Sequence, residues 1–485
     1  MRKPVDEDEP SLPFPTSPVS NMEWCPLPIT PKQRLVAKLI EEETVARAKR
    51  HGMTRAQFLR TAAATATAFM VMNKIHGLDQ TGDAAAMPVS KEQCDDLDAA
   101  RELLDPHDLF VMDVQQHHID TPRWGAYCRG LRFVESTLPY TIRDVQCPEA
   151  TSQLNYIREV FVDSKTTIGV ISGLPFGVPL GPTVMAQTRD LVNGIAGSER
   201  AISQAVCDPL APDNGETALV TLDHQVEVMK GRALKCYTYS FGGWRLDDEM
   251  VSYPMLEKAQ SLGIRLVNVH KGLPAIFAPS SPQSVRTLDF PKVVRDWPRF
   301  KFCAYHSGFF QAGTHPEGKD GLTEWLEVVA SIPKKQRRRV YTEIGSSFAI
   351  NLLDSPDQAA HFIGQLLKAF GSKNILWGTD SIWWGSPQWL IDAFVALEIP
   401  AAMQEQFGYP PLTMKDKRRI LGENAARLYG VKIKRARCTV PEDRITQMQV
   451  AQGGARNQRS LRWYGPQTRR DFFAFLRWGE ARGAV

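Results

Sequence analysis

The sequence predicts an α/β protein built on a closed (β/α)8 barrel, the TIM-barrel arrangement. From about residue 108 to residue 433, short apolar runs alternate with helical stretches. About eight strand-helix units fit into a segment of this length, which is usual for such a barrel. A doubly wound open sheet is the alternative, but its glycine-rich phosphate turn is missing after the first expected strand. The barrel is therefore the fold that we expect.

Eight segments are expected to form the barrel strands, because each is a short apolar run between turn or helix signals. They are residues 109–114, 166–172, 218–222, 233–239, 264–270, 300–306, 339–344 and 374–380. Helical patterns separate most of them, for example at residues 281–298, 321–333 and 357–370.

Two further regions flank the expected barrel. Residues 1–107 form an N-terminal extension, in which an extended or disordered lead of about 30 residues precedes helices at 30–76 and 90–106. Residues 434–485 form a basic, aromatic tail. Such a tail could bind RNA or an acidic surface. The interpretation that we favour is that it folds back over its own domain or supports a subunit contact.

The overall composition excludes several classes of protein. The 485 residues are 43% hydrophobic and 23% charged, with a net charge of only +4, so no nucleic-acid partner is expected. The eight cysteines include no CxxC pair, which argues against a zinc finger and a disulfide framework. No apolar run reaches about 18 residues, so no membrane span is expected.

Residues 53–73 have features of an export signal. The stretch has a basic start and continues with small apolar residues, and it resembles a degenerate twin-arginine signal in which Ala56 replaces the second arginine. It begins some fifty residues into the chain, and an amphipathic helix of the mature protein is the alternative. The expected location is therefore left open, as cytoplasmic, or periplasmic if the signal functions.

Potential metal ligands stand at the ends of four expected strands. In a barrel, the C-terminal ends of the strands form the active site. Imidazole and carboxylate suit zinc, manganese or iron, and an open coordination position lets the metal acidify a water or polarise a substrate oxygen. We therefore expect one divalent ion, zinc first, with manganese or iron as alternatives. The residues concerned are Gln115, His117, His270, His306 and Asp380.

These residues give the chain a resemblance to the amidohydrolase superfamily, in the amidohydrolase-related branch that contains aminocarboxymuconate semialdehyde decarboxylase. The branch has an HxH-like pair on strand one, histidines on strands five and six, and an aspartate in a "GTD" phrase on strand eight. The phrases "HSG" and "WGTD" and the closing "GENAARLYG" match this pattern over residues 108–433. The resemblance implies a metal-dependent hydrolase fold, a small-molecule substrate and a homodimer.

Gln115 departs from the pattern, because a glutamine amide is a weak, neutral ligand. It could ligate weakly, Gln116 or His118 could take its place, or the metal could be lost. Strand alternation disfavours the second reading, since Gln115 and His117 share one face. We expect a site of His117, His270 and Asp380, with Gln115 as a weak fourth ligand or water anchor. His306 and Asp380 are the expected catalytic residues.

Further side chains are candidates for binding the substrate. Glu343 ends strand seven, Tyr239 follows strand four, and Trp244 and Trp384 could form apolar walls. Arg245 could bind a substrate carboxylate in a bidentate manner. Each of them has an ordinary structural role as its alternative.

Three functions are compatible with this set of residues. The leading one is a hydrolase in which metal-activated water attacks a C–N or C–O bond and Asp380 accepts a proton. The first alternative is a metal-dependent non-oxidative decarboxylase of an aromatic or unsaturated carboxylic acid. The second is a barrel without metal that acts as a binding protein, since Gln115 could mark a lost site.

Overall fold

The computed structural model describes residues 12–76, 85–106, 109–119, 151–177, 180–456, 461 and 463–473. The first eleven residues of the expected lead and the last twelve of the expected tail lie outside the described residues. Two of the eight cysteines, Cys128 and Cys147, also lie outside them.

The described strands are parallel and follow one another around the molecule in chain order. Only Gln204 separates β3 from β4, so the two segments form one continuous barrel strand that pairs with β2 through its first half and with β5 through its second. Counted in this way, the series has eight barrel strands. The strands are β1 (Met112–Gln116), β2 (Ile168–Ile171), β3 (Ala201–Ser203), β4 (Ala205–Val206), β5 (Leu234–Tyr237), β6 (Leu266–Gly272), β7 (Lys301–Phe309), β8 (Val340–Glu343) and β9 (Ile375–Leu376).

Backbone hydrogen bonds join the last strand to the first. The N–H of Val114 donates to the carbonyl of Trp377 at 3.0 Å, and the N–H of His117 donates to that of Ser381 at 2.7 Å. Gln116 and Ser381 also form a parallel bridge. These contacts close the barrel, and the predicted fold is confirmed.

One expected strand was wrong. Residues 218–222 form a 3-10 turn (Leu219–Thr221) and the start of helix α10 (Leu222–Glu227), and the third barrel strand is instead the segment 201–206. Val220 is 56% exposed, so the run lacks the buried face that a barrel strand needs. The Gln225 side chain exchanges hydrogen bonds with the backbone of Val206 at 2.8 and 2.9 Å, which holds α10 against β4.

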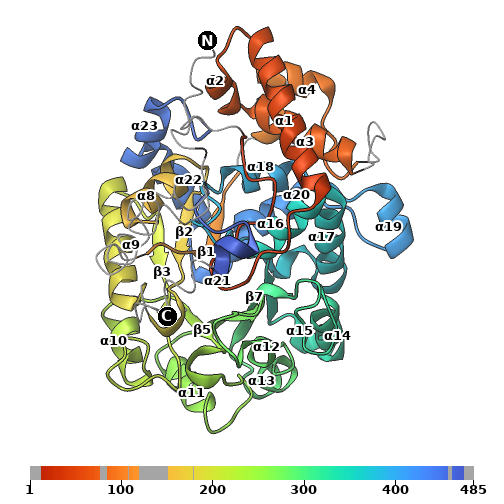
Figure 1. Ribbon diagram of the computed structural model, residues 1–485. Helices are drawn as coiled ribbons and strands as arrows, with labels where there is room; N and C mark the ends of the chain where they lie inside the picture. Colours follow the sequence, from red (N-terminus) through yellow and green to blue (C-terminus); the bar gives the residue numbers. More distant parts are fainter. Residues whose placement is uncertain are drawn as a thin grey trace.

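Helices surround the barrel, as Figure 1 shows. Most carry an apolar face that packs onto the strands, for example Val293 and Val328 in the cluster that covers β5 to β8. The longer ones are α9 (Pro182–Ala196), α11 (Tyr253–Ser261), α13 (Phe290–Asp296), α14 (Thr323–Ser331), α16 (Gly345–Asp354), α17 (Pro356–Phe370), α18 (Gln388–Ala396), α19 (Ala401–Phe407) and α21 (Asn424–Tyr429).

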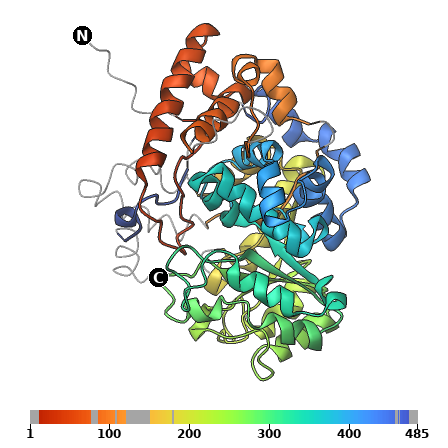
Figure 2. The ribbon, with the colours of Figure 1, turned by 90° about the vertical axis from the view of Figure 1, so that its right-hand side faces the viewer.

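The described part of the N-terminal extension contains five helices, which gather at one end of the molecule (Figures 1 and 2). Thr30 and Ser90 begin two of them with capping boxes, and Asp96 divides the single helix expected at 90–106. No helix in the described part of the chain is long and apolar enough to cross a membrane. The helices are α1 (Pro31–Arg50), α2 (Arg55–Leu59), α3 (Ala62–Ile75), α4 (Lys91–Asp95) and α5 (Leu97–Leu104).

Residues 12–30, which we call the strap, cross the centre of the barrel in front of β1 and β7 (Figure 1). The strap has no helix or strand, but Phe14 and Trp24 are each only 2% exposed. The tail holds it in place, since Ser20 donates its N–H to the carbonyl of Pro466 at 2.9 Å and Gln467 donates to the Ser17 hydroxyl at 3.0 Å. The tail itself packs on the barrel through α22 (Ile433–Thr439) and α23 (Arg444–Ala451).

Candidate active site

The end of β1 directs two side chains toward the centre of the barrel. Its register with β2 shifts between Asp113 and Gln116, as in a β-bulge. Gln115, within the shift, and His117, just after it, both reach Asp380, which follows β9. The neighbouring Gln116 and His118 point the other way, toward α8 (Gln153–Ile157) and α9: Tyr156 donates to Gln116 at 2.8 Å, and His118 lies 2.8 Å from the Thr188 hydroxyl.

Asp380 lies at the centre of the group and is 1% exposed. Its Oδ1 lies 3.2 Å from His117 Nε2 and accepts from Gln115 Nε2 at 3.1 Å. Its Oδ2 accepts from Ser346 at 2.5 Å and from Asn21 at 2.8 Å. Burial alone would raise the pKa of this carboxyl, but the hydrogen bond from His117 and the nearby His306 hold the pKa below its ordinary value. Asp380 is therefore ionised at neutral pH.

His270 on β6 and His306 on β7 lie side by side, with ring centroids 4.7 Å apart. Both are fully buried, and burial lowers the pKa of each to about 3, helped by Lys235 for His270 and by His270 for His306. Neutral imidazole is the form that binds metals. Gln115 Nε2 lies 3.1 Å from His306 Nε2, so one amide contacts both His306 and Asp380.

Glu343 at the end of β8 supports the backbone beside His306. Its carboxylate accepts the N–H of His306 at 3.0 Å and that of Gly345 at 2.5 Å. Burial raises its pKa to about 8. His306 and Asp380 both have positive φ angles, 60° and 59°, which are strained for residues other than glycine and typical of functional sites. Glu343 thus holds the strained backbone of β7 at His306.

Besides Glu343, two of the expected substrate-binding residues border the group. The Tyr239 ring lies 5.1 Å from the His270 ring, and Trp384 Nε1 lies 3.4 Å from the Ser346 hydroxyl. The structure does not bring Trp244 and Arg245 there. Trp244 packs in the apolar cluster between strands and outer helices, and the half-exposed Arg245 forms a bidentate pair with Asp247 at 2.8 and 2.9 Å.

The strap adds two residues that the sequence interpretation missed. Asn21 donates to Asp380, and Glu23 accepts from the Tyr239 hydroxyl at 2.5 Å. They are 5% and 6% exposed. No local pattern singled them out, because a proline-rich, acidic segment is typical of an exposed lead. The one available signal was Trp24, a large apolar residue beside them that a solvated segment seldom carries.

The residues present fit a divalent metal ion. Among the described residues, one group of three or more potential ligands has its ligand atoms within 4.8 Å of one another, and it consists of Glu23, His270 and His306. The third histidine of the expected site, His117, is not in this group, and its Nε2 lies 3.2 Å from Asp380 Oδ1. The Nδ1 atoms of His117, His270 and His306 are buried and have no hydrogen-bond partner in the described part of the chain. Buried nitrogens of this kind are ready to bind a cation.

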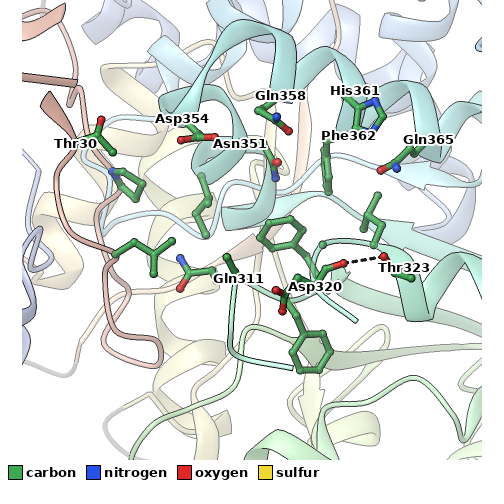
Figure 3. A pocket seen from close by; sticks show the side chains of 18 of the residues that line it. Thr30, Gln311, Asp320, Thr323, Asn351, Asp354, Gln358, His361, Phe362 and Gln365 are labelled. Carbon is green, nitrogen blue, oxygen red and sulfur yellow. Dashed lines mark hydrogen bonds between the residues drawn. The ribbon is translucent and has the colours of Figure 1, made fainter. Parts of the chain in front are cut away.

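A separate cavity of about 540 Å³ lies beside the strap. Figure 3 shows Asn351, Asp354 and Gln358 along one side and Gln311 and Asp320 along another. The strap residues Leu27 and Thr30 complete its wall. Asp380 and the candidate ligands do not line it.

Comparisons with solved structures find resemblances of low sequence identity. A 5-carboxyvanillate decarboxylase from Sphingomonas paucimobilis is 14% identical, with a TM-score of 0.43, and the match covers 67% of this chain and 100% of that one. A putative 2-pyrone-4,6-dicarboxylic acid hydrolase from Pseudomonas putida is 15% identical, with a TM-score of 0.40 and coverages of 67% and 98%. A 2,6-dihydroxybenzoate decarboxylase from Rhizobium is 11% identical, with a TM-score of 0.42 and coverages of 67% and 99%.

No curated protein matches the chain. A protein-family model described as amidohydrolase matches residues 182–431, which is just over half of the sequence. The match includes His270, His306 and Asp380 but begins after β1, so the unusual Gln115 lies outside it. The chain belongs to the amidohydrolase family.

Proposed function

We propose that the protein is a metal-dependent hydrolase that cleaves a C–N or C–O bond in a small molecule. The observation that carries this proposal is the convergence of an ionised Asp380 with three buried histidines at the C-terminal end of the barrel. The family to which the chain belongs supports it. Strand ends are where barrel enzymes build their active sites.

Asp380 is the residue that accepts a proton in this proposal. Its Oδ1 faces His117 and Gln115, while Asn21 and Ser346 hold its Oδ2 in place. A carboxylate that is fixed at one oxygen can use the other to take a proton in a defined direction. Tyr239 and Trp384 border the reacting region and exclude bulk water.

His270 and His306 hold the metal in this proposal, with Asp380 or Glu23 as the carboxylate ligand. A divalent ion supplies acidified water and polarises a carbonyl oxygen. We propose zinc first, because neutral nitrogen ligands and a carboxylate suit it, with manganese or iron as alternatives. His306 also stands close enough to Gln115 to orient the amide.

Non-oxidative decarboxylation of an aromatic or unsaturated acid is the second candidate. The observation that favours it is the burial of the group beneath the strap, where Trp24 and Trp384 are 2% and 1% exposed. A decarboxylase consumes no water, so a closed site suits it. The same residues serve both reactions.

Product analysis with the purified protein distinguishes the two reactions. We would load it with Zn²⁺ or Mn²⁺ and supply aryl esters, lactones and amides in ¹⁸O-labelled water, and hydroxybenzoic acids in a parallel assay. Label in the acid product indicates hydrolysis, whereas release of carbon dioxide together with an unlabelled organic product that has lost its carboxyl group indicates decarboxylation. His117→Ala and Asp380→Ala should each lower kcat/KM by about 10³-fold. A wild type without metal, whose ligand binding is indifferent to both substitutions, would point to a binding protein.

A further inference from the structure

The strap is held firmly at the point where it crosses the barrel. Glu23 accepts the N–H of Ile276 at its carbonyl, with an N–O distance of 2.8 Å. The Ser20 hydroxyl donates to the Trp24 carbonyl and closes a tight turn around Asn21 and Glu23. The Trp24 and Trp384 rings lie 6.3 Å apart. The Glu23 side chain is therefore placed in the barrel by a fixed backbone.

The Glu23 carboxylate reaches the two central histidines. Its Oε1 accepts from Tyr239, its Oε2 accepts from Asn21 at 2.7 Å, and Oε2 lies 3.7 Å from His270 Nδ1. Two ligands of one tetrahedral zinc ion, each about 2.0–2.2 Å from the metal, lie about 3.4 Å apart. The separation of Glu23 and His270 is close to that value.

His270 is oriented to present a free nitrogen toward Glu23. Its Nε2 lies 3.3 Å from the carbonyl of Leu273, to which it can donate a proton, and its Nδ1 has no hydrogen-bond partner among the described residues. A backbone carbonyl that holds one ring nitrogen of a histidine fixes the tautomer in which the other nitrogen is the metal ligand.

Gln115 does not supply the charge that a ligand on strand one would supply. Its amide contacts Asp380 and His306, and it is neutral. Glu23 and Asp380 are both buried, and a buried carboxylate needs a cationic partner. The buried Lys235 lies over the Tyr305 ring, with its Nζ 3.9 Å from the ring centroid, and makes no hydrogen bond within the described structure. The side chains that donate hydrogen bonds to the Glu23 carboxylate, Tyr239 and Asn21, are neutral, so a cation between Glu23 and the histidines would give this carboxylate a charged partner.

We propose that Glu23 is a metal ligand delivered by the strap, so that Glu23, His270 and His306 hold a divalent cation and Glu23 replaces the ligand that Gln115 cannot provide. This inference rests on the proposed metal-dependent function and names a ligand for it. It makes residues far outside the barrel an integral part of the site.

Metal binding by the full chain tests the inference without an activity assay. Metal-free wild type, Glu23→Gln and His270→Ala would be titrated with Mn²⁺ and followed by electron paramagnetic resonance and equilibrium dialysis. Glu159→Gln is the matched control, because it removes a buried carboxylate elsewhere. We expect one ion per chain in the wild type and the control, and an affinity about 100-fold weaker or more in Glu23→Gln and His270→Ala. Thermal unfolding of each variant without metal checks that it folds.

A second substitution tests whether the affinity lost in Glu23→Gln reflects the loss of a metal ligand. Gln115→His, added to Glu23→Gln, should recover at least tenfold of the lost affinity, because it restores an imidazole on strand one. If Glu23→Gln binds Mn²⁺ as tightly as the wild type while His270→Ala does not, the strap ligand is wrong and the proposed function stands. If the wild type binds no divalent ion, both are wrong.

Discussion

Asn21 in the strap donates a hydrogen bond to Asp380 at the end of the barrel, with 2.8 Å between Asn21 Nδ2 and Asp380 Oδ2, across 359 positions of sequence. The contact ties a segment that precedes the first helix to the residue that carries the proposed chemistry. It also places Asn21 and Glu23 on the N-terminal side of the export-like stretch at residues 53–73.

The first prediction concerns processing of the chain. Cleavage after the export-like stretch would remove Asn21 and Glu23, and it would also cut within the buried helix α3 (Ala62–Ile75). We therefore expect the active protein to keep its strap. Intact-mass measurement and N-terminal sequencing of protein purified from its natural host check this. An active form that begins beyond residue 73 would contradict it.

The second prediction concerns Gly378, which has no side chain and so leaves space for the Glu343 carboxylate. A Cβ atom at this position would lie 2.1 Å from Glu343 Oε1 and 3.1 Å from Gln115 Cβ. Gly378→Ala should therefore cost about 1–3 kcal/mol of unfolding free energy, since a packed interior cannot yield at both points. Metal affinity should fall as well, because Glu343 holds the backbone at His306.

Gly194→Ala is the control for this substitution. Gly194 lies in α9, and a Cβ there would meet nothing within 4 Å. It should leave stability unchanged or raise it by up to about 1 kcal/mol. Equal effects of the two alanines in urea denaturation would refute the packing argument.

The third prediction tests the docking of the tail. Asp443, at the start of α23, accepts from Arg200 Nη1 at 3.0 and 3.1 Å, and both side chains are at most 3% exposed. Asp443→Ala should lower the unfolding free energy by about 3 kcal/mol, because it leaves a buried guanidinium without its partner. Arg245→Ala breaks a half-exposed pair and should cost less than about 1 kcal/mol. Similar losses in calorimetry would contradict this ranking.

The fourth prediction concerns the pH dependence of stability. Burial raises the pKa of Glu159 to about 8 from 4.5, and its Oε1 accepts from Tyr464 at 2.6 Å. The folded chain thus binds this proton more tightly than the unfolded chain, so the contribution is complete below pH 4.5 and disappears as the pH rises through about 8.

Replacing Glu159 isolates that contribution. The unfolding free energy of the wild type minus that of Glu159→Gln should decrease between pH 5 and pH 8, by up to roughly 4 kcal/mol. Urea denaturation of both proteins at several pH values measures it. A difference that is constant with pH would show that Glu159 does not hold a proton in the folded chain.

Most of the barrel could be predicted from the sequence, because the apolar runs that mark its strands are local features. Apolar runs marked seven of the eight strands, and the ligands at their ends converge because the ends of parallel strands meet at one side of a barrel. The third strand was missed because it is short and Gln204 interrupts it, whereas "ALVTL" has strong β-propensity but begins a helix. The local sequence pattern could not distinguish the strand at residues 201–206 from the start of the helix at residues 218–222.

The strap contacts could not be predicted in the same way. Asn21 and Glu23 reach the site through long-range contacts of the strap, among them the packing of Trp24 and the hydrogen bonds from Ser20 to Pro466 and from Ile276 to Glu23. The sequence of a proline-rich, acidic segment does not indicate which residues it will contact. Similarly, the half-exposed Arg245 pairs with Asp247 in the turn after β5. Strand periodicity does not predict the conformation of a turn, so this pair could not be expected.

Anomalous diffraction from crystals of the full chain grown with Mn²⁺ would show whether a divalent ion binds among the strand-end histidines. We expect one anomalous peak per chain, within about 2.0–2.3 Å of nitrogen atoms from His270 and His306 and of a carboxylate oxygen from Glu23 or Asp380. Crystals that hold no ion among these side chains at saturating Mn²⁺ would contradict this expectation.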